Sequence, residues 1–393
     1  MSRYITNIHV NKLFHLNNIN IPIADEKYPH LIITGKNGSG KTILLNAIAT
    51  LLELMLSKNG VDRKRIVLYP NGSHAYELSM NRKTAKLDCI LYQPEDIRER
   101  YHNRDFIIAF YQADRSLKMI VPTSPQNADI RITNIRRVAS NQFIKFLVDL
   151  KFQELLAISH QDNEKVNSIR KWFSDFEILL KTLFQDNNLS LLFNQEKGYS
   201  FKINLGKQSF GFNEMSDGFK SAINIVADLI LRMQDGKNIS NVYLKEGIVL
   251  IDEIETHLHL ALQKIIMPFL TKTFPNIQFI VTTHSPFVLS SMSNAVAYDL
   301  EHQKLVKNPA QYSYESLAEG YFGVTAISSD IQHRLNIIKE LLDKEDLSVS
   351  EKATLRNYLK DFDNIPEAVS PSLIGEYLQT KLKHIVKIKE LMQ

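Results

Sequence analysis

The sequence is poor in the features that mark exported or membrane-bound chains. Among 393 residues there is one cysteine, Cys89, which excludes an internal disulfide framework and fits a reducing compartment. The N-terminus lacks the apolar core of a secretion signal. No apolar run reaches membrane-spanning length, since the best candidate, residues 221–233, is interrupted by Asn224, Asp228 and Arg232. We therefore expect a soluble, cytoplasmic protein with no membrane contact.

An excess of charge of one sign is also lacking. Lys and Arg number 47 and Asp and Glu 43, and the resulting net charge of +4 is too small to indicate nucleic-acid binding by itself. The basic residues gather in three clusters: Lys58, Arg63, Lys64 and Arg65; Arg98, Arg100, His102 and Arg104; and Arg131, Arg136 and Arg137. We favour an ordinary solvated surface for these clusters, and a groove that follows a nucleic-acid backbone is the alternative.

One short segment is rich in glycine and predicts a phosphate-binding loop (P-loop). It reads Gly35, Lys36, Asn37, Gly38, Ser39, Gly40, Lys41 and Thr42. An apolar run over residues 31–34 precedes the loop and a helix-like apolar run over residues 43–52 follows it, which is the expected context. The loop N–H groups and the helix N-terminus would bind the β- and γ-phosphates, Lys41 would supply a cation, and Thr42 would ligate Mg²⁺. The expected ligand is a nucleoside triphosphate.

Acidic residues and a histidine follow two further apolar runs. Residues 247–251 form a β-branched and leucine run that ends in Asp252 and Glu253. At the end of a buried parallel strand, Asp252 would hold the metal and Glu253 would polarise the attacking water as general base. A third run, residues 277–283, ends in His284, where a neutral imidazole could reach the γ-phosphate or the water.

A second anion site is expected at Ser216 and Gly218. Both residues lie at the start of a helical run that continues from residue 222 to residue 233. The serine hydroxyl, the glycine N–H and the helix N-terminus together favour an anion. One nucleotide does not need two such sites from one subunit, so we expect two copies to face each other head to tail around the same γ-phosphate.

These motifs resemble the ATP-binding-cassette (ABC) superfamily, in which a Leu-Ser-Gly-Gly-Gln loop, the signature, completes the partner's site. Within it the chain is similar to the soluble branch that contains the overcoming-lysogenisation-defect (OLD) ATPases, the SMC-like DNA-repair and chromosome-maintenance ATPases and many bacterial antiphage ATPases. Residues 215–220, 251–259 and 274–286 carry the likeness, which spans about residues 4–298. The resemblance implies ATP and Mg²⁺ as ligands. It makes Ser216 and Gly218 the signature contacts in trans, Glu253 the catalytic glutamate and His284 the switch histidine.

The same resemblance makes residues 255–259 the loop that crosses the subunit interface. The alternative for this loop is a zinc site at His257 and His259, which is weak because no further Cys or His is near. The sequence departs from the family pattern at two positions. Phe219 replaces a polar residue after the signature glycine, and Leu260 stands where this branch commonly has proline, so nucleotide binding is expected more firmly than hydrolysis.

The superfamily also has a glutamine, after an internal strand, that senses Mg²⁺ and the attacking water. Residues 106–111 read as a strand and Gln112 follows them, so we assign this role to Gln112, with Gln93 as the competitor. For the adenine, Phe14 is a weak candidate that fits the core equally well.

The predicted fold is α/β: an ABC-type P-loop ATPase with a β-rich N-terminal lobe, a mixed and mainly parallel core sheet, an inserted helical hairpin and a C-terminal helical tail. Its expected parts are residues 1–139 with the P-loop and Gln112, 140–186 as the hairpin, 187–305 with the signature and His284, and 306–393 as the tail. The hairpin is too short for a long coiled coil, and we favour a packing lobe over a partner-binding arm. Residues 373–392 read as one amphipathic helix with a lysine-rich face.

The sequence of the tail, residues 306–393, predicts no nuclease domain. Its single Asp-x-Asp, Asp361 to Asp363, lies at a helix end with no strand before it, unlike the acidic strand ends of the OLD nucleases. The leading hypothesis is therefore an ATPase whose homodimer, or higher oligomer, senses a cue and controls a separate effector in antiviral defence. Septu-type ATPases, including those attached to retrons and paired with an HNH nuclease, are the nearest arrangement.

Three rival functions remain at the level of sequence. The first is a DNA-repair or chromosome-associated ATPase that acts directly on nucleic acid. The second is the nucleotide-binding subunit of a transporter, against which the helical insertion and the extra tail stand. The third is an ATP-locked scaffold that binds the nucleotide without appreciable turnover.

Overall fold

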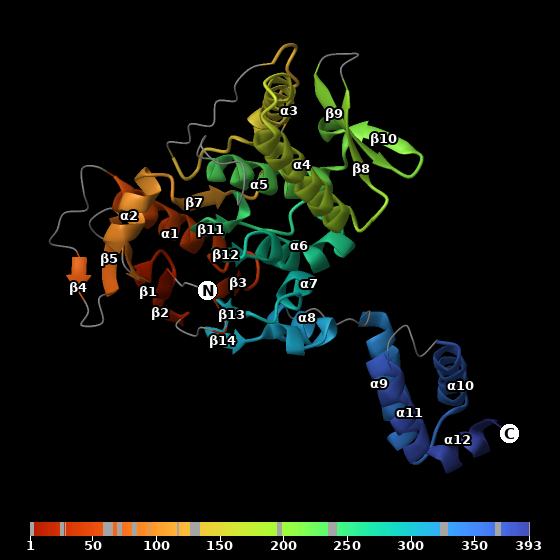
Figure 1. The fold of residues 1–393 in the computed structure, drawn as a ribbon. Helices are drawn as coiled ribbons and strands as arrows, with labels where there is room; N and C mark the ends of the chain where they lie inside the picture. The colour runs from red at the N-terminus through yellow and green to blue at the C-terminus, as the bar shows by residue number, and fades with distance from the viewer. Residues whose placement is uncertain are drawn as a thin grey trace. The chain divides into compact units, whose positions relative to one another are not determined.

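The computed structural model describes residues 4–23, 27, 29–57, 66–68, 73–80, 85–92, 94–115, 118–125, 134–194, 199–234, 242–322, 329–365 and 371–392. The chain forms two compact units, residues 1–317 and 318–393 (Figure 1). The finer division into four parts stays a prediction. Among the described helices, none is long and apolar enough to cross a bilayer.

A six-stranded sheet forms the centre of the first unit. Its order is β14 (Lys304–Lys307), β13 (Ala295–Asp299), β3 (His30–Thr34), β12 (Ile277–Thr282), β11 (Glu246–Ile251) and β7 (Phe106–Tyr111). All neighbours pair in parallel except β13 and β14. The continuous apolar runs of β3, β7, β12 and β13 are buried throughout, as strands covered on both faces must be. The predicted α/β fold with a mainly parallel core sheet is confirmed.

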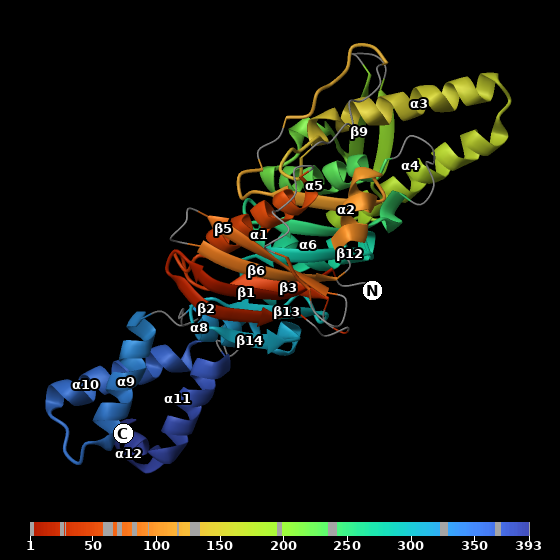
Figure 2. The same ribbon diagram turned by 90° about the vertical axis from the view of Figure 1, so that its left-hand side faces the viewer.

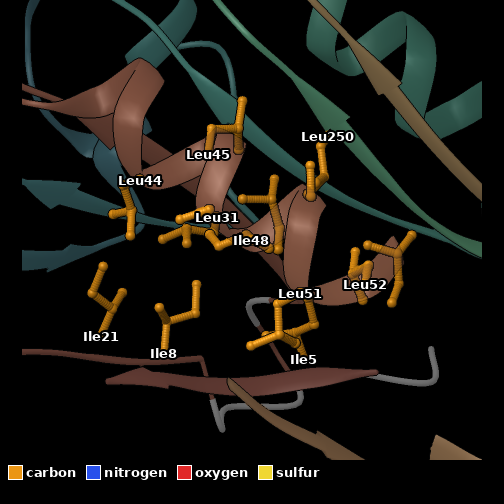
Figure 3. Packing of buried hydrophobic residues seen from close by; sticks show 14 of the residues in the cluster. Ile5, Ile8, Ile21, Leu31, Leu44, Leu45, Ile48, Leu51, Leu52 and Leu250 are labelled. Atoms are coloured by element: carbon orange, nitrogen blue, oxygen red, sulfur yellow. The ribbon is translucent and has the colours of Figure 1, made fainter. Parts of the chain in front are cut away.

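Helix α1 (Lys41–Leu56) packs between this sheet and a second sheet. The second sheet is antiparallel, in the order β2 (Leu16–Pro22), β1 (Ile5–Leu13), β6 (Ala85–Tyr92), β5 (Ser73–Met80) and β4 (Ile66–Leu68) (Figure 2). Figure 3 shows Ile8 and Ile21 of this sheet facing Leu44 and Leu51 of α1, and all four belong to one buried cluster. Each fully buried leucine or isoleucine contributes about 1.5–3 kcal/mol, so this layer fixes α1 and the P-loop before it.

The other face of the core sheet carries α5 (Asp217–Met233). Alternate residues of β7, Phe106, Ile108 and Phe110, join the cluster around α1, whereas Tyr111 points to the opposite face. There its hydroxyl donates to Asp228 Oδ2 of α5 at 2.6 Å. Helices α2 (Pro94–His102), α6 (Leu260–Thr273) and the short α7 (Pro286–Leu289) complete the layer structure.

A helical hairpin stands between β7 and α5 in the chain. It consists of α3 (Phe143–Ser159) and α4 (Asn163–Phe184), and Asp162 caps α4 by accepting the N–H of Lys165 at 3.0 Å. A three-stranded antiparallel sheet follows, in the order β10 (Gln208–Gly211), β9 (Ser200–Leu205) and β8 (Ser190–Asn194). Phe173 of α4 stacks on Phe201 of β9 at 5.6 Å, so the hairpin packs on this small sheet.

The second unit is a bundle of short helices. Helix α8 (Tyr314–Phe322) crosses the unit boundary, and α9 (Ser329–Asp343), α10 (Val349–Asp363), α11 (Pro371–Lys383) and α12 (Ile385–Met392) follow. The expectation of one helix over residues 373–392 is wrong. The helix is interrupted at His384, between α11 and α12, and Tyr377 of α11 and Ile388 of α12 both belong to one buried cluster.

Polar groups of the second unit are used in packing. Tyr377 donates to Asp363 Oδ1 at 2.7 Å, and Lys381 pairs with the same oxygen at 2.5 Å. Lys387 donates to the Leu342 carbonyl at 2.9 Å. Asp363 of the Asp-x-Asp pair thus has structural partners. Within the described residues, no group of three or more His, Cys, Asp or Glu is placed to hold a metal ion.

Candidate functional site

The P-loop joins β3 to α1 in a tight curl. Gly35, Gly38 and Gly40 have φ of +135°, +82° and +99°, a backbone region that residues with a Cβ rarely adopt. A Cβ on Gly35 would lie 2.9 Å from Ser39 Oγ. The predicted loop therefore has the geometry that turns successive N–H groups inward, at the N-terminus of a 16-residue helix.

Lys41 closes the loop from inside. It is buried, and its Nζ donates to the carbonyls of Gly35 at 2.8 Å and Lys36 at 2.9 Å. Burial lowers the pKa of Lys41, while nearby carboxylates led by Glu253 oppose that shift. Among the described residues, the ammonium donates to backbone carbonyls alone, and phosphate oxygens could take their place.

Asp252 lies beside Thr42, the P-loop residue that could hold a metal ion. Thr42 Oγ1 donates to Asp252 Oδ1 at 3.2 Å, although the two residues are 210 positions apart. Thr282 at the end of β12 donates to the same oxygen at 2.6 Å and accepts the N–H of Glu253 at 2.7 Å. A hydroxyl and a carboxylate at this spacing are oxygen ligands of the kind that Mg²⁺ takes. Sequence reasoning missed Thr282, whose only signal is its place at the end of the neighbouring strand.

Glu253 sits in a strained turn next to this pair. Its φ is +44°, unusual for a residue other than glycine, and such strain concentrates at functional sites. Its side chain is partly exposed and accepts a long hydrogen bond of 3.3 Å from Thr256 Oγ1. One long hydrogen bond from Thr256 is thus the side-chain contact that the described residues give this carboxylate.

His284 is half-buried and lies two residues after the end of β12. Burial, and then the charge of Lys41, lower its pKa, so its imidazole is neutral near pH 7. Glu255 fixes this corner: its carboxylate accepts the Thr283 hydroxyl at 2.7 Å and the backbone N–H of His284. Burial raises the pKa of Glu255. The expectation for Glu255 was an interface loop, and its contact with the His284 segment was not foreseen.

Gln112 follows β7 at the same edge. The N–H of Asp252 donates to the carbonyl of Tyr111 at 2.8 Å, so the backbone of Gln112 lies next to that of Asp252. Its side chain is exposed. Its competitor, Gln93, lies outside the described residues. Phe14 is 62% exposed at the turn between β1 and β2, so it does not belong to the core.

The signature segment begins α5. Ser216 is the N-cap residue, is exposed, and its side chain makes no hydrogen bond to the first turn of the helix. The first-turn N–H groups of α5 are thus not capped by this serine. Gly218 is buried against the loop that follows Glu253: a Cβ there would lie 2.9 Å from the carbonyl of His257. The two candidate signature residues are therefore an exposed cap and a packing contact.

Phe219, the departure from the family pattern, has a structural partner. Its ring stacks on Phe184, the last residue of α4, with centroids 4.0 Å apart, and meets His259 edge-on at 5.9 Å. The aromatic contact joins the hairpin to the signature helix. Leu260, the second departure, is 58% exposed at the first position of α6.

Three arginines of the basic clusters, within the described part of the chain, have partners inside the fold. Arg100 pairs with Glu246 at 2.7 Å, Arg136 pairs with Glu53 at 3.0 Å, and Arg98 donates to the carbonyl of Ser57 at 3.0 Å. The cluster over residues 58–65 and Arg131 lie outside the described part of the chain. Arg98, Arg100 and Arg136 thus contact residues of α1, the residue after it and β11.

Parts of this chain are similar to known proteins. The Septu protein PtuA of Bacillus mycoides (strain KBAB4) is 25% identical over 392 residues, which cover 94% of this chain and 50% of that protein. The Retron Ec83 probable ATPase of Escherichia coli is 42% identical over 97 residues, or 24% of this chain and 18% of that protein. The chain thus spans half or less of these relatives. A solved SmcHead bound to the C-winged helix domain of ScpA aligns with a TM-score of 0.41 and 17% identity, over 79% of this chain and 100% of that chain.

A family model also matches the centre of the chain. The family is described as "AAA domain, putative AbiEii toxin, Type IV TA system", and the match covers residues 31–290. That range contains the P-loop, the signature segment, Asp252, Glu253 and His284. Together with the Septu and retron relatives, the match confirms the predicted resemblance to ATP-binding ATPases of the antiphage type. The chain belongs to this AAA-domain family.

Proposed function

We propose that the protein is an ATPase whose two sites form between two copies facing head to tail. One observation carries the proposal: the candidate catalytic groups gather at one sheet edge, joined by the hydrogen bonds from Thr42 and Thr282 to Asp252. Ser216 is an exposed residue at the start of α5, and its side chain does not cap the helix. A second copy can supply this helix start to the open side of the nucleotide.

Each residue of the site has a role in this proposal. The P-loop N–H groups and Lys41 bind the phosphates, with Lys41 exchanging its two carbonyl acceptors for phosphate oxygens. Thr42 and Asp252, with Gln112 nearby, would hold Mg²⁺, which would neutralise charge on the phosphates. Glu253 accepts the proton of the attacking water.

His284 and the signature complete the site. The neutral imidazole can hydrogen-bond the γ-phosphate or the water, and Glu255 keeps its backbone in place. Ser216 and the first N–H groups of α5 would bind the partner's γ-phosphate in trans. Hydrolysis is then linked to association. Each copy carries a P-loop and a signature segment, but in this proposal the two act on different nucleotides, so one copy alone completes neither site.

A variant-mixing experiment tests the shared site. Lys41→Ala and Ser216→Arg should each abolish phosphate release. When the two variants are mixed in equal amounts and pair at random, half of the dimers contain one copy of each. Such a dimer has one intact site, in which Lys41 comes from one copy and Ser216 from the other. If sites act independently, about a quarter of wild-type activity returns. No recovery, with exchange of subunits shown separately, would refute a shared site.

The proposal extends to a separate effector in antiviral defence, with an HNH nuclease as the candidate. Its support is the similarity to a Septu protein and to a retron ATPase. Phage plaque counts on cells that carry the chain with its candidate nuclease would test it. Protection should require both proteins and be lost with Glu253→Gln. Protection by the chain alone would contradict the separate effector.

A further inference from the structure

Arg115 is a buried arginine in the segment after Gln112. It is 5% exposed. Its guanidinium donates to five acceptors: the Ser221 hydroxyl at 3.0 Å and the carbonyls of Gln112 at 3.0 Å, Asp252 at 2.6 Å, Glu253 at 2.8 Å and Ile254 at 3.3 Å. These acceptors come from three separate segments, namely the Gln112 segment, the turn after β11 and helix α5.

The acceptors of Arg115 are all uncharged. Burying a cation without a carboxylate in contact is costly, and among the described residues Arg115 forms no ion pair. Burial lowers its pKa to about 10, against the opposing charges of Glu255, Asp252 and Glu253. The burial of this guanidinium therefore has to be explained by something other than an ion pair. The planar fork of arginine, which can bind several carbonyls at fixed angles, supplies such an explanation.

Three consecutive carbonyls of the turn after β11 point at this one guanidinium. The middle carbonyl belongs to Glu253, the residue with φ of +44°. Without these bonds the turn could relax toward an ordinary backbone conformation, which would move the Glu253 carboxylate. Arg115 therefore holds the turn without touching the carboxylate itself.

The segment that carries Arg115 is also fastened to α5. The Arg115 Nε donates to Ser221, and the Arg115 carbonyl accepts Asn224 Nδ2 at 3.1 Å. Ser221 lies five positions after Ser216, so this link reaches the part of the helix that begins at the signature. These bonds connect the helix that begins at Ser216 to the segment that holds the Glu253 turn.

We propose that Arg115 is a positioning residue that holds the Glu253 turn in its strained form and joins it to the signature helix. The inference rests on the proposed function, in which Glu253 is the general base. Arg115→Lys keeps the charge but loses the fork. Phosphate release at saturating ATP should fall roughly 10- to 100-fold, because small displacements of a catalytic group have effects of that size. ATP affinity should stay within about twofold, since Lys41, Thr42 and the Asp252 side chain are untouched.

A double-mutant cycle separates positioning from a general loss of structure. Single-turnover phosphate release is compared in wild type, Arg115→Lys, Glu253→Gln and the double variant. If Arg115 acts through Glu253, the double variant is no slower than Glu253→Gln alone. A further loss as large as that of Arg115→Lys in the wild-type background would overturn the inference while leaving the proposed function intact. Unchanged release in Glu253→Gln would overturn both.

Two further variants keep the test decisive if Arg115→Lys folds poorly. Ser221→Ala removes the bond between the guanidinium and α5, while Asn224 still donates to the Arg115 carbonyl, and it should lower release several-fold with the same dependence on Glu253. Arg232→Lys is the matched control. Arg232 is also a buried arginine, 7% exposed, it lies on α5 like Ser221, and it pairs with Asp228 at 2.7 Å. Arg232→Lys should lower thermal stability but not the release rate of the folded protein. Full activity in Ser221→Ala would refute the link to α5.

Discussion

His30 gives the first unit a specific sensitivity to mild acid. The residue is the first of β3 and is fully buried. Its Nδ1 accepts the N–H of Phe279 at 3.1 Å, so the ring proton is on Nε2, for which no described residue provides a hydrogen-bond partner. Protonation would charge a buried ring and break the bond to Phe279. Burial lowers the pKa of His30 from 6.5 to about 4.

The size and sign of the effect follow from this shift. In the unfolded chain His30 takes up a proton near pH 6.5, whereas in the folded unit it does so only near pH 4. Between these values the unfolded state binds more protons, so stability present above pH 6.5 is lost as the pH falls. The loss amounts to about 2 kcal/mol at pH 5 and roughly 3 kcal/mol below pH 4.

The assay uses the single tryptophan of the chain. Trp172 lies buried in α4, so its fluorescence reports the unfolding of the first unit alone. Urea unfolding at pH 7 and pH 5 is measured for wild type, His30→Gln and, as the control, the exposed His160→Gln. The glutamine variant should lose about 2 kcal/mol less than wild type between the two pH values, whatever its stability at pH 7. Equal losses in wild type and His30→Gln would refute the reasoning.

Three glycine and capping predictions follow from contacts already described. Gly247→Ala puts a Cβ 2.4 Å from the Ile107 carbonyl, inside the parallel sheet, and should cost about 3 kcal/mol or more in urea unfolding; a loss under about 1 kcal/mol would contradict that packing. Gly218→Ala puts a Cβ 2.9 Å from the His257 carbonyl, so the head-to-tail dimerisation proposed above, measured by light scattering with ATP, should weaken, and undiminished dimerisation would contradict this packing argument. Asp162→Ala removes the α4 cap and should lower the Trp172 unfolding free energy by about 1 kcal/mol, with Asp162→Asn retaining most of it.

The core of the fold follows from local patterns. Residues 31–34, 106–111, 247–251 and 277–282 are short, mainly apolar runs rich in β-branched residues, which is typical of strands in a sheet covered on both faces. The antiparallel sheet and the hairpin follow from period-2 and helical patterns in the same way. The turn at His384 could not be predicted, because helical periodicity continues through it and only packing among α9, α10 and α12 divides the segment.

The phosphate-binding half of the candidate site is equally local. Its glycines, Lys41 and Thr42 are contiguous, and their spacing alone specifies the loop. The supporting contacts are not contiguous: Thr282 reaches Asp252 across 30 positions, and Arg115 reaches Asp252 across 137. A threonine or arginine at such positions has no distinguishing pattern in one sequence, since its role exists only once the strand order is set.

Phe219 illustrates how a departure from a motif can be read only in three dimensions. As sequence, an aromatic residue after the signature glycine suggested a weakened site. In the fold its ring covers Phe184 at the end of the hairpin and contacts His259 in the loop beyond Glu253. A polar residue there would leave Phe184 without that stacking partner, a loss of about 0.5–1.5 kcal/mol beyond area burial. The substitution therefore exchanges a polar group beside the signature for a fixed connection between the hairpin and α5, the same helix to which Arg115 ties the Glu253 turn.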